Sequence, residues 1–184
     1  MRRLIFQMMI SLDGYFEGSQ GSLDWHIVDK EFNDYAVELL KSVDGLIFGH
    51  RTYDLMESYW TSPDALHNDP EVTPYMNDLT KYVFSKELKS VHWKNTILIH
   101  SDPAVEISRI KKLPGKNMAI FGSSNLMLSL IDKGVVDEYR IFISPTILGQ
   151  GNSLFKGLGK RVNLKLRDSR VLKSGNVLLK YVEK

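Results

Sequence analysis

The sequence contains no cysteine among its 184 residues. That absence excludes a disulfide framework, a catalytic thiol and any metal site built from thiolates, and it is typical of proteins from a reducing compartment. Long apolar runs are also missing, since the run from Leu4 to Ile10 is too short to span a membrane. Gln7 within this run and Asp13 just after it are atypical of a signal peptide. We therefore expect a cytoplasmic protein without a membrane partner.

A marked excess of one charge is lacking as well. The chain has 24 Lys and Arg against 22 Asp and Glu, a net charge of +2, which gives no reason to expect nucleic acid as a partner. The balance is uneven, because residues 156–184 hold nine basic and two acidic side chains. We favour the interpretation that these lysines and arginines guard exposed strand edges. The alternative is that they attract a phosphorylated ligand.

The apolar pattern alternates between strand-like and helix-like segments over most of the chain. We expect strands at 3–10, 46–49, 81–85, 96–100, 118–121, 135–144, 162–167, 170–172 and 177–182, and helices at 29–43, 50–60, 74–79, 104–113 and 125–134. Segments 16–28 and 61–74 are expected to be loops. This order predicts one α/β domain over residues 1–184, with three α/β/α layers, a central mixed, mostly parallel sheet and a C-terminal antiparallel hairpin.

Two of these strands run directly into a glycine and then a helix. The first is the Gly122-Ser123-Ser124 turn, and the second is Gly49-His50-Arg51-Thr52. Backbone N–H groups and the positive end of the helix dipole make such junctions anion sites, although most turns of this kind only connect a strand to a helix. Two of them at the carboxyl edge of one sheet would suit two phosphates. Arg51 is a candidate for a nucleotide 2′-phosphate, and Thr52 is a natural cap and donor.

Three stretches together resemble a known family. They are Ser11-Leu12-Asp13-Gly14 at the end of the first strand, Leu46 to Tyr53 with its Gly-x-Arg-Thr pattern, and Gly122 to Leu126 followed by Pro145-Thr146-Ile147-Leu148-Gly149-Gln150-Gly151. The chain resembles the dihydrofolate reductase superfamily, and within it the branch that contains the reductase domain of bacterial riboflavin biosynthesis proteins. The likeness covers nearly the whole chain in order, and its last stretch is the most specific.

The resemblance implies a mixed eight-stranded sheet and NADPH as the hydride donor. It places the cofactor near Gly49, Arg51, Thr52, Ser85, Gly122, Ser123, Ser124, Asn125 and Leu126. It places the substrate near Met9, Asp13, Trp25 and Tyr53. One departure is Ser123, which stands where the family usually has a second glycine of the cofactor turn.

The catalytic acid is the least defined part of the expected site. Folate reductases hold the pterin with one carboxylate on the first helix, and Asp29, Glu31 and Asp34 lie in that region, although each is more typical of a solvated helix acid. Asp13 is our candidate catalytic residue; it either hydrogen-bonds the substrate or forms an Asx turn. Trp25 either covers the pocket or packs against its loop, and Tyr53 is more typical of a core residue. No metal site is expected.

The leading hypothesis is an NADPH-dependent reductase of a small heterocyclic metabolite. The nearest named activity is reduction of 5-amino-6-(5-phosphoribosylamino)uracil in riboflavin biosynthesis. The second hypothesis is dihydrofolate reductase itself, which needs one of the acids at 29–34 in the pocket. A third, of another class, is a nucleotide- or ligand-binding domain without catalysis. The expected partners are a small-molecule substrate and, as in related proteins, a second copy of the chain in a homodimer.

Overall fold

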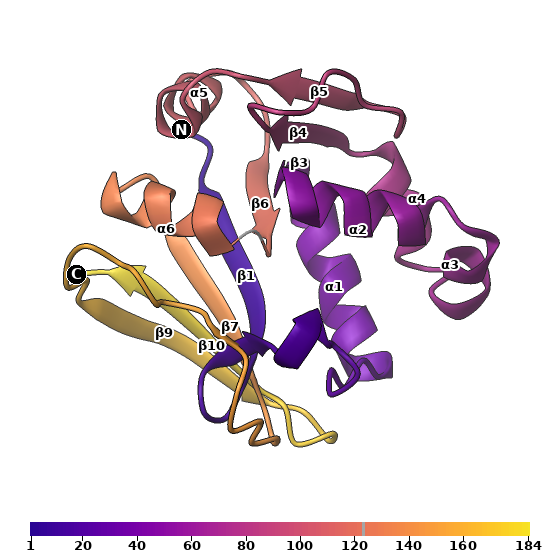
Figure 1. Cartoon of the computed structure of the whole chain (residues 1–184), viewed down its shortest axis with the longest axis vertical. Coiled ribbons are helices and arrows are strands. Elements are labelled where there is room, and N and C mark those ends of the chain that lie inside the picture. Colours follow the sequence, from indigo (N-terminus) through magenta and orange to yellow (C-terminus); the bar gives the residue numbers. More distant parts are fainter. Residues whose placement is uncertain (123) are drawn as a thin grey trace.

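A computed structural model describes residues 1–122 and 124–184. Its main sheet contains β1 (Leu4–Ser11), β3 (Val43–Gly49), β4 (Thr80–Phe84), β5 (Thr96–Ile99), β6 (Asn117–Phe121), β7 (Glu138–Ser144), β9 (Leu164–Val171) and β10 (Val177–Glu183). The strand order is β5-β4-β3-β6-β1-β7-β10-β9 (Figure 1). All pairs from β5 to β7 are parallel, whereas β10 pairs antiparallel with both β7 and β9. A separate ribbon pairs β2 (Tyr15–Glu17) with β8 (Asn152–Ser153).

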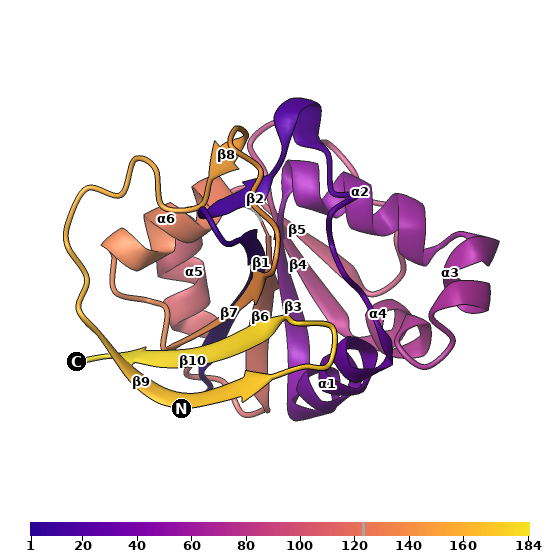
Figure 2. The same cartoon turned by 90° about the horizontal axis from the view of Figure 1, so that it is seen from below.

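Helices cover both faces of the main sheet. They are α1 (Lys30–Ser42), α2 (His50–Trp60), α3 (Pro63–Asn68), α4 (Thr73–Asp78), α5 (Pro103–Ile110) and α6 (Ser124–Asp132). The first four lie toward one side of the sheet, and α5 and α6 lie on the other (Figure 2). None of the helices in the described part of the chain is long and apolar enough to cross a bilayer.

Two apolar cores, one on each face of the sheet, explain the unbroken hydrophobic runs of the central strands. In β1, Ile5 and Met9 pack into the core shared with α1 and α4, while Leu4 and Phe6 pack into the core shared with α5 and α6. Successive side chains of a strand point to opposite faces, so a strand covered on both sides needs apolar residues at every position. The predicted three-layer α/β fold with its C-terminal antiparallel strands is confirmed.

Some local predictions were wrong. Residues 61–74 are not a loop throughout, because they contain α3. The Ser62 hydroxyl accepts a hydrogen bond from the backbone N–H of Ala65, and Pro63 occupies the first helical turn, where its missing N–H has no cost. Within 16–28 the structure has the end of β2 and a short 3₁₀ turn, Ser19–Gly21. The strands expected at 162–167 and 170–172 form one strand, β9.

Three of the nine basic residues of 156–184, Lys165, Arg167 and Arg170, lie in the edge strand β9. β9 is the last strand in the order, and seven of its eight residues are exposed. Its free edge would pair readily with another chain if it were apolar, and lysine and arginine side chains discourage that pairing. This placement supports the edge-guarding interpretation of the excess positive charge.

Lys81 is the most deeply buried charged side chain in the described part of the chain and yields a stability prediction. Its residue is 0 % exposed, and its Nζ donates to the carbonyl oxygens of Met76, Asn77 and Leu79 at the C-terminus of α4. We expect Lys81→Met to lower the free energy of unfolding by about 2 kcal/mol, because one buried and two partly buried carbonyl groups lose their donor. Lys94→Met is the control, since Lys94 pairs with Asp78 on the exposed surface and should cost less than about 0.5 kcal/mol. Urea unfolding of both variants tests the difference.

Candidate functional site

A cleft opens in the middle of the sheet because β6 is shorter than its neighbours. β6 ends at Phe121, opposite Gln7 of β1, while β1 continues along β7 to Ser11 and β3 continues along β4 to Gly49. Ligands of open α/β sheets bind in such crevices at the carboxyl ends of the strands. Here the crevice is a cavity of about 980 Å³, whose walls come from β1, β2, α1, α2, α4 and the start of α6.

The N-termini of α2 and α6 meet at one end of this cavity. Gly122 has φ = +65°, and a Cβ atom built on it would lie 3.2 Å from Cγ2 and 3.3 Å from Oγ1 of Thr52. The glycine thus permits both the left-handed backbone and the close approach of the two helices. Gly49 caps α2, and the first residues of both helices line the cavity. Two helix N-termini, each at the positive end of a helix dipole, make this end suitable for anions such as phosphate.

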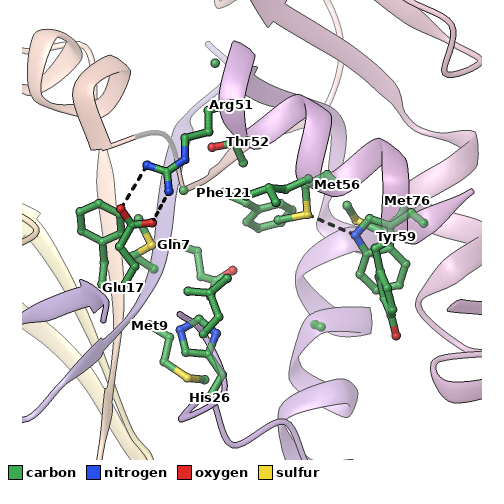
Figure 3. Close-up of a pocket in the computed structure, with 18 of the residues that line it drawn as sticks. Gln7, Met9, Glu17, His26, Arg51, Thr52, Met56, Tyr59, Met76 and Phe121 are labelled. Atoms are coloured by element: carbon green, nitrogen blue, oxygen red, sulfur yellow. Dashed lines mark hydrogen bonds and ion pairs between the residues drawn. The ribbon is translucent and has the colours of Figure 1, made fainter. Parts of the chain in front are cut away.

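Arg51 is held at this end by an acidic partner that the sequence analysis did not identify. Its Nη1 and Nη2 donate to Oε1 and Oε2 of Glu17 at 3.1 and 3.0 Å, as the close-up in Figure 3 shows. The Glu17 side chain is 7 % exposed, whereas that of Arg51 is 69 % exposed. Asn152 also donates to Oε1 of Glu17 at 2.5 Å. An incoming phosphate would therefore share the Arg51 guanidinium, which has five N–H donors, with a buried carboxylate.

The glycine-rich segment that ends at Gly151 positions Glu17. Gly151 has φ = +144°, and a Cβ atom there would overlap the carbonyl oxygen of Glu17. Only glycine allows β8 to come this close to β2, and the pairing of Glu17 with Asn152 follows from that approach. The close approach of β8 to β2 explains why a glycine stands at position 151, in the stretch of the sequence that resembles the family most specifically.

The other end of the cavity is mainly apolar. Its walls include Phe32 and Ala36 of α1, Met56 and Trp60 of α2, and Met76 of α4. The indole N–H of Trp60 donates to the Met56 sulfur at 3.2 Å, so this N–H already has an acceptor. Three polar groups interrupt this surface, namely Asn33, Tyr59 and Asp69. One end of the cavity therefore suits phosphate and the other a flat, largely apolar group.

The cavity brings most of the predicted cofactor residues together. Its lining includes Gly49, Arg51, Thr52, Gly122, Ser124, Asn125 and Leu126, together with Met9, which was predicted to lie near the substrate. Ser123 lies outside the described residues. Ser85 does not line the cavity; its hydroxyl oxygen accepts hydrogen bonds from the backbone N–H groups of Glu87 and Leu88. The ligand contacts of these residues remain predictions.

Two aromatic residues that were predicted to touch substrate lie outside the lining. Trp25 is 9 % exposed, and its indole N–H donates to the carbonyl oxygen of Ser22 at 3.2 Å. Tyr53 is 2 % exposed; its hydroxyl donates to Glu57 at 2.7 Å and accepts from the backbone N–H of Trp93. These contacts match the alternatives considered for them, packing against the loop for Trp25 and core packing for Tyr53.

Asp13, the predicted catalytic residue, also does not line the cavity. Its carboxylate accepts hydrogen bonds from the Ser11 hydroxyl and from the backbone N–H groups of Leu148 and Gly149. The Ser11 hydroxyl, with further help from the two amides, lowers the pKa of Asp13 to about 2. A carboxyl group with this pKa holds no proton to donate near neutral pH. The contacts favour a role in fixing the 145–149 turn, and the catalytic role stays a prediction without a supporting contact.

The hydrogen bonds by which Asp13 fixes the 145–149 turn lead to a testable prediction. In Asp13→Asn we expect the amide hydrogens of Leu148 and Gly149 to exchange about ten times faster at neutral pH, because their acceptor loses its charge. In the wild type the same bonds should persist above pH 3.8 and weaken as the pH falls through about 2, where the folded-state carboxyl takes up its proton. Amide exchange followed by NMR measures both effects. Unchanged exchange in the variant would show that the turn does not depend on Asp13.

The acids of α1 occupy positions outside the cavity lining. Asp29 caps the helix by accepting from the backbone N–H of Phe32 at 2.9 Å, and Glu31 accepts from the backbone N–H of Lys173 at 2.6 Å. Asp34 forms an exposed ion pair with Lys30. Among the described residues that line the cavity, the carboxylates are instead Glu17 and Asp69. The dihydrofolate reductase hypothesis needs one of the acids at 29–34 in the pocket, and none of these three acids lines the cavity.

His26 and Asp69 also line the cavity, although neither was predicted to be a site residue. Burial lowers the pKa of His26, so the ring is neutral at physiological pH. Its Nε2 is buried and has no hydrogen-bond partner among the described residues, and its ring lies beside the cavity (Figure 3). No sequence motif marks either residue, because each lies in a loop and only the course of that loop brings it to the cavity.

Comparisons with known proteins agree with this architecture. A family model described as "RibD C-terminal domain" matches residues 2–178. An uncharacterized Bacillus subtilis protein, YyaP, is 32 % identical over 180 residues, which cover 98 % of this chain and 94 % of YyaP.

Two solved structures show the same fold at low sequence identity. One is a diaminohydroxyphosphoribosylaminopyrimidine deaminase/5-amino-6-(5-phosphoribosylamino)uracil reductase from Thermotoga maritima, with a TM-score of 0.73, 15 % identity and coverage of 100 % of this chain and 57 % of that chain. The other is dihydrofolate reductase from Enterococcus faecalis complexed with NADP(H), with a TM-score of 0.67, 16 % identity and coverage of 99 % and 96 %.

Proposed function

The chain belongs to the RibD C-terminal domain family, and from that premise we propose that it is an NADPH-dependent reductase of a small heterocyclic compound. The observation that carries the proposal is the two-ended cavity. Two helix N-termini and Arg51 lie at one end, and an apolar, aromatic surface lies at the other. A dinucleotide with phosphates at the first end would extend its nicotinamide toward the second.

The residues at the first end fit the phosphates of NADPH. Gly122 has no side chain to block the approach of an anion to the N-terminus of α6, and the start of α2 lies against it. Arg51 provides the planar fork that binds a phosphate in a bidentate manner. We propose that Gly49, Thr52 and residues 124–126 complete this set.

The protein's own contribution would be binding, alignment and the exclusion of water. Bound NADPH supplies the hydride. The apolar walls around Phe32, Met56 and Met76 would keep water from the reacting ring, and Met9 would support the ring from the sheet. Because the described residues do not place Asp13 against the cavity, we assign no proton transfer to it.

The first substrate to test is 5-amino-6-(5-phosphoribosylamino)uracil, which the name of the Thermotoga maritima protein includes. Dihydrofolate is the second, in view of the Enterococcus faecalis structure. A ligand-binding domain without catalysis is the proposal of another class; it predicts NADPH or ligand binding without NADPH oxidation.

The test begins with the cofactor. Trp60 lines the cavity, so its fluorescence should report titration with NADPH and, in parallel, with NADH. We expect a dissociation constant on the order of micromolar for NADPH and weaker binding of NADH. Oxidation of NADPH, followed by its absorbance, then tests both substrates. Absence of binding by either nucleotide would contradict the proposal, and binding without oxidation of any heterocycle would favour the non-catalytic alternative.

A further inference from the structure

The apolar end of the cavity contains a connected polar group that none of the comparisons identifies. Asn33 of α1 donates from Nδ2 to Oδ1 of Asp69 at 2.9 Å, and the Tyr59 hydroxyl of α2 donates to Oδ2 of the same carboxylate. All three residues line the cavity. Asp69 lies between α3 and α4, so the group joins three separate segments around one carboxylate.

This carboxylate retains capacity for a ligand. Each carboxylate oxygen accepts up to about two hydrogen bonds, and the structure gives each oxygen of Asp69 one side-chain donor. Asp69 is only partly buried and faces a cavity whose neighbouring walls are Val72, Met76 and Trp60. The remaining lone pairs therefore suit two adjacent N–H donors on one edge of a flat ring.

The charge at this end argues against a phosphorylated ligand there. The ionisable groups among the described lining residues, apart from Tyr59, are Glu17, His26, His50, Arg51 and Asp69. Arg51 lies at the opposite end and is paired with Glu17, and burial keeps His26 neutral. None of the basic residues of 156–184 lines the cavity. A phosphate near Asp69 would meet a negative charge without a cation to offset it.

We propose that Asp69, held by Asn33 and Tyr59, is the substrate-specificity residue of the cavity, and that it selects a flat unphosphorylated heterocycle with two adjacent N–H donors on one edge. This inference rests on the proposed reductase function and narrows its substrate class. It separates the chain from enzymes that act on phosphoribosyl substrates. The substrate's apolar faces lie between the α1 and α4 side chains and those of α2.

Two matched ligand pairs test the proposal by calorimetry, with and without NADPH. In the first pair, 2-aminoquinolinium offers two adjacent N–H donors, and 2-methylquinoline has the same shape but near neutral pH offers neither donor and carries no charge. We expect the amino compound to bind about 10- to 30-fold more tightly, the range of a charge-assisted hydrogen bond. In the second pair, guanosine, whose N1–H and 2-amino group are adjacent donors, should bind at least about 10-fold more tightly than guanosine 5′-monophosphate once NADPH occupies the other end.

Variants separate ligand binding from a merely structural role. Asp69→Asn should reduce the preference for 2-aminoquinoline to about twofold or less, because the charge is lost while the size is kept. Asp64→Asn is the control, since it removes an exposed charge from neighbouring α3 and does not line the cavity. The double variant Asn33→Asp/Asp69→Asn moves the carboxylate across the same hydrogen bond and should restore much of the preference.

The outcomes distinguish this proposal from the reductase function. If NADPH binds and both quinolines bind equally to the wild type, the assignment of Asp69 is wrong and the reductase proposal stands. If neither nucleotide binds but the 2-aminoquinoline preference depends on Asp69, the reductase proposal fails and the subsite is supported. A preference that survives in Asp69→Asn, or tighter binding of the monophosphate than of guanosine in the presence of NADPH, overturns the inference.

Discussion

Replacing Gly122 by alanine is expected to weaken NADPH binding about 100-fold. The new Cβ atom would lie 3.2 Å from the Thr52 side chain, so the starts of α2 and α6 must move apart by a few tenths of an ångström. That movement withdraws backbone N–H groups from the phosphates, and the loss of about two charge-assisted hydrogen bonds costs about 2.7 kcal/mol. Fluorescence titration with NADPH measures the change.

Gly134 provides a matched control at the other end of α6. It has the same φ of +65°, but a Cβ atom there would meet nothing within 4 Å. Gly134→Ala and Gly122→Ala should therefore share a backbone strain of about 1–2 kcal/mol in the free energy of unfolding. Only Gly122→Ala should lose cofactor affinity. Equal NADPH affinity in the two variants would contradict a phosphate site at the junction of the helices.

The predictable part of the site is the part that local sequence encodes. Gly49 before α2 and Gly122 before α6 mark strand-to-helix junctions, because the glycine, the cap and the apolar spacing all lie within a few residues. The layer order follows from the alternation of strands and helices in the same way. These signals placed the first end of the cavity and gave the correct architecture without any knowledge of distant contacts.

The rest depends on contacts between segments far apart in the chain. Glu17 meets Arg51 across 34 positions, and Asn33 meets Asp69 across 36. Neither pair has a sequence signature, because the residues around a single carboxylate give no sign of which helix it will approach. The prolines of 61–74 predict a loop, whereas Pro63 begins α3. With α3 unrecognised, nothing in the sequence indicated that Asp69, the residue after this helix, would reach the cavity. The homodimer stays a prediction.

Replacing Arg51 by alanine should weaken NADPH binding about 30-fold and NADH binding less than about 3-fold. A bidentate guanidinium–phosphate contact contributes about 2 kcal/mol, and NADH lacks the 2′-phosphate that we assign to Arg51. Arg51→Lys should fall between the wild type and alanine, because it keeps the charge and loses the planar fork. Equal losses for the two nucleotides would instead assign Arg51 to the pyrophosphate that both contain.

Replacing Glu17, the ion-pair partner of Arg51, is expected to change the affinity for NADPH in the opposite direction. Glu17→Gln removes the charge that holds the Arg51 guanidinium and keeps a side chain of the same size beside Asn152. A phosphate no longer shares the guanidinium with a carboxylate, so we expect NADPH to bind about 5- to 10-fold more tightly, with little change for NADH. The double variant Glu17→Gln/Arg51→Ala should lose that gain, because the freed guanidinium is its source. Weaker NADPH binding by Glu17→Gln alone would mean that the carboxylate orients Arg51 for the phosphate, and that the two partners act together rather than in competition.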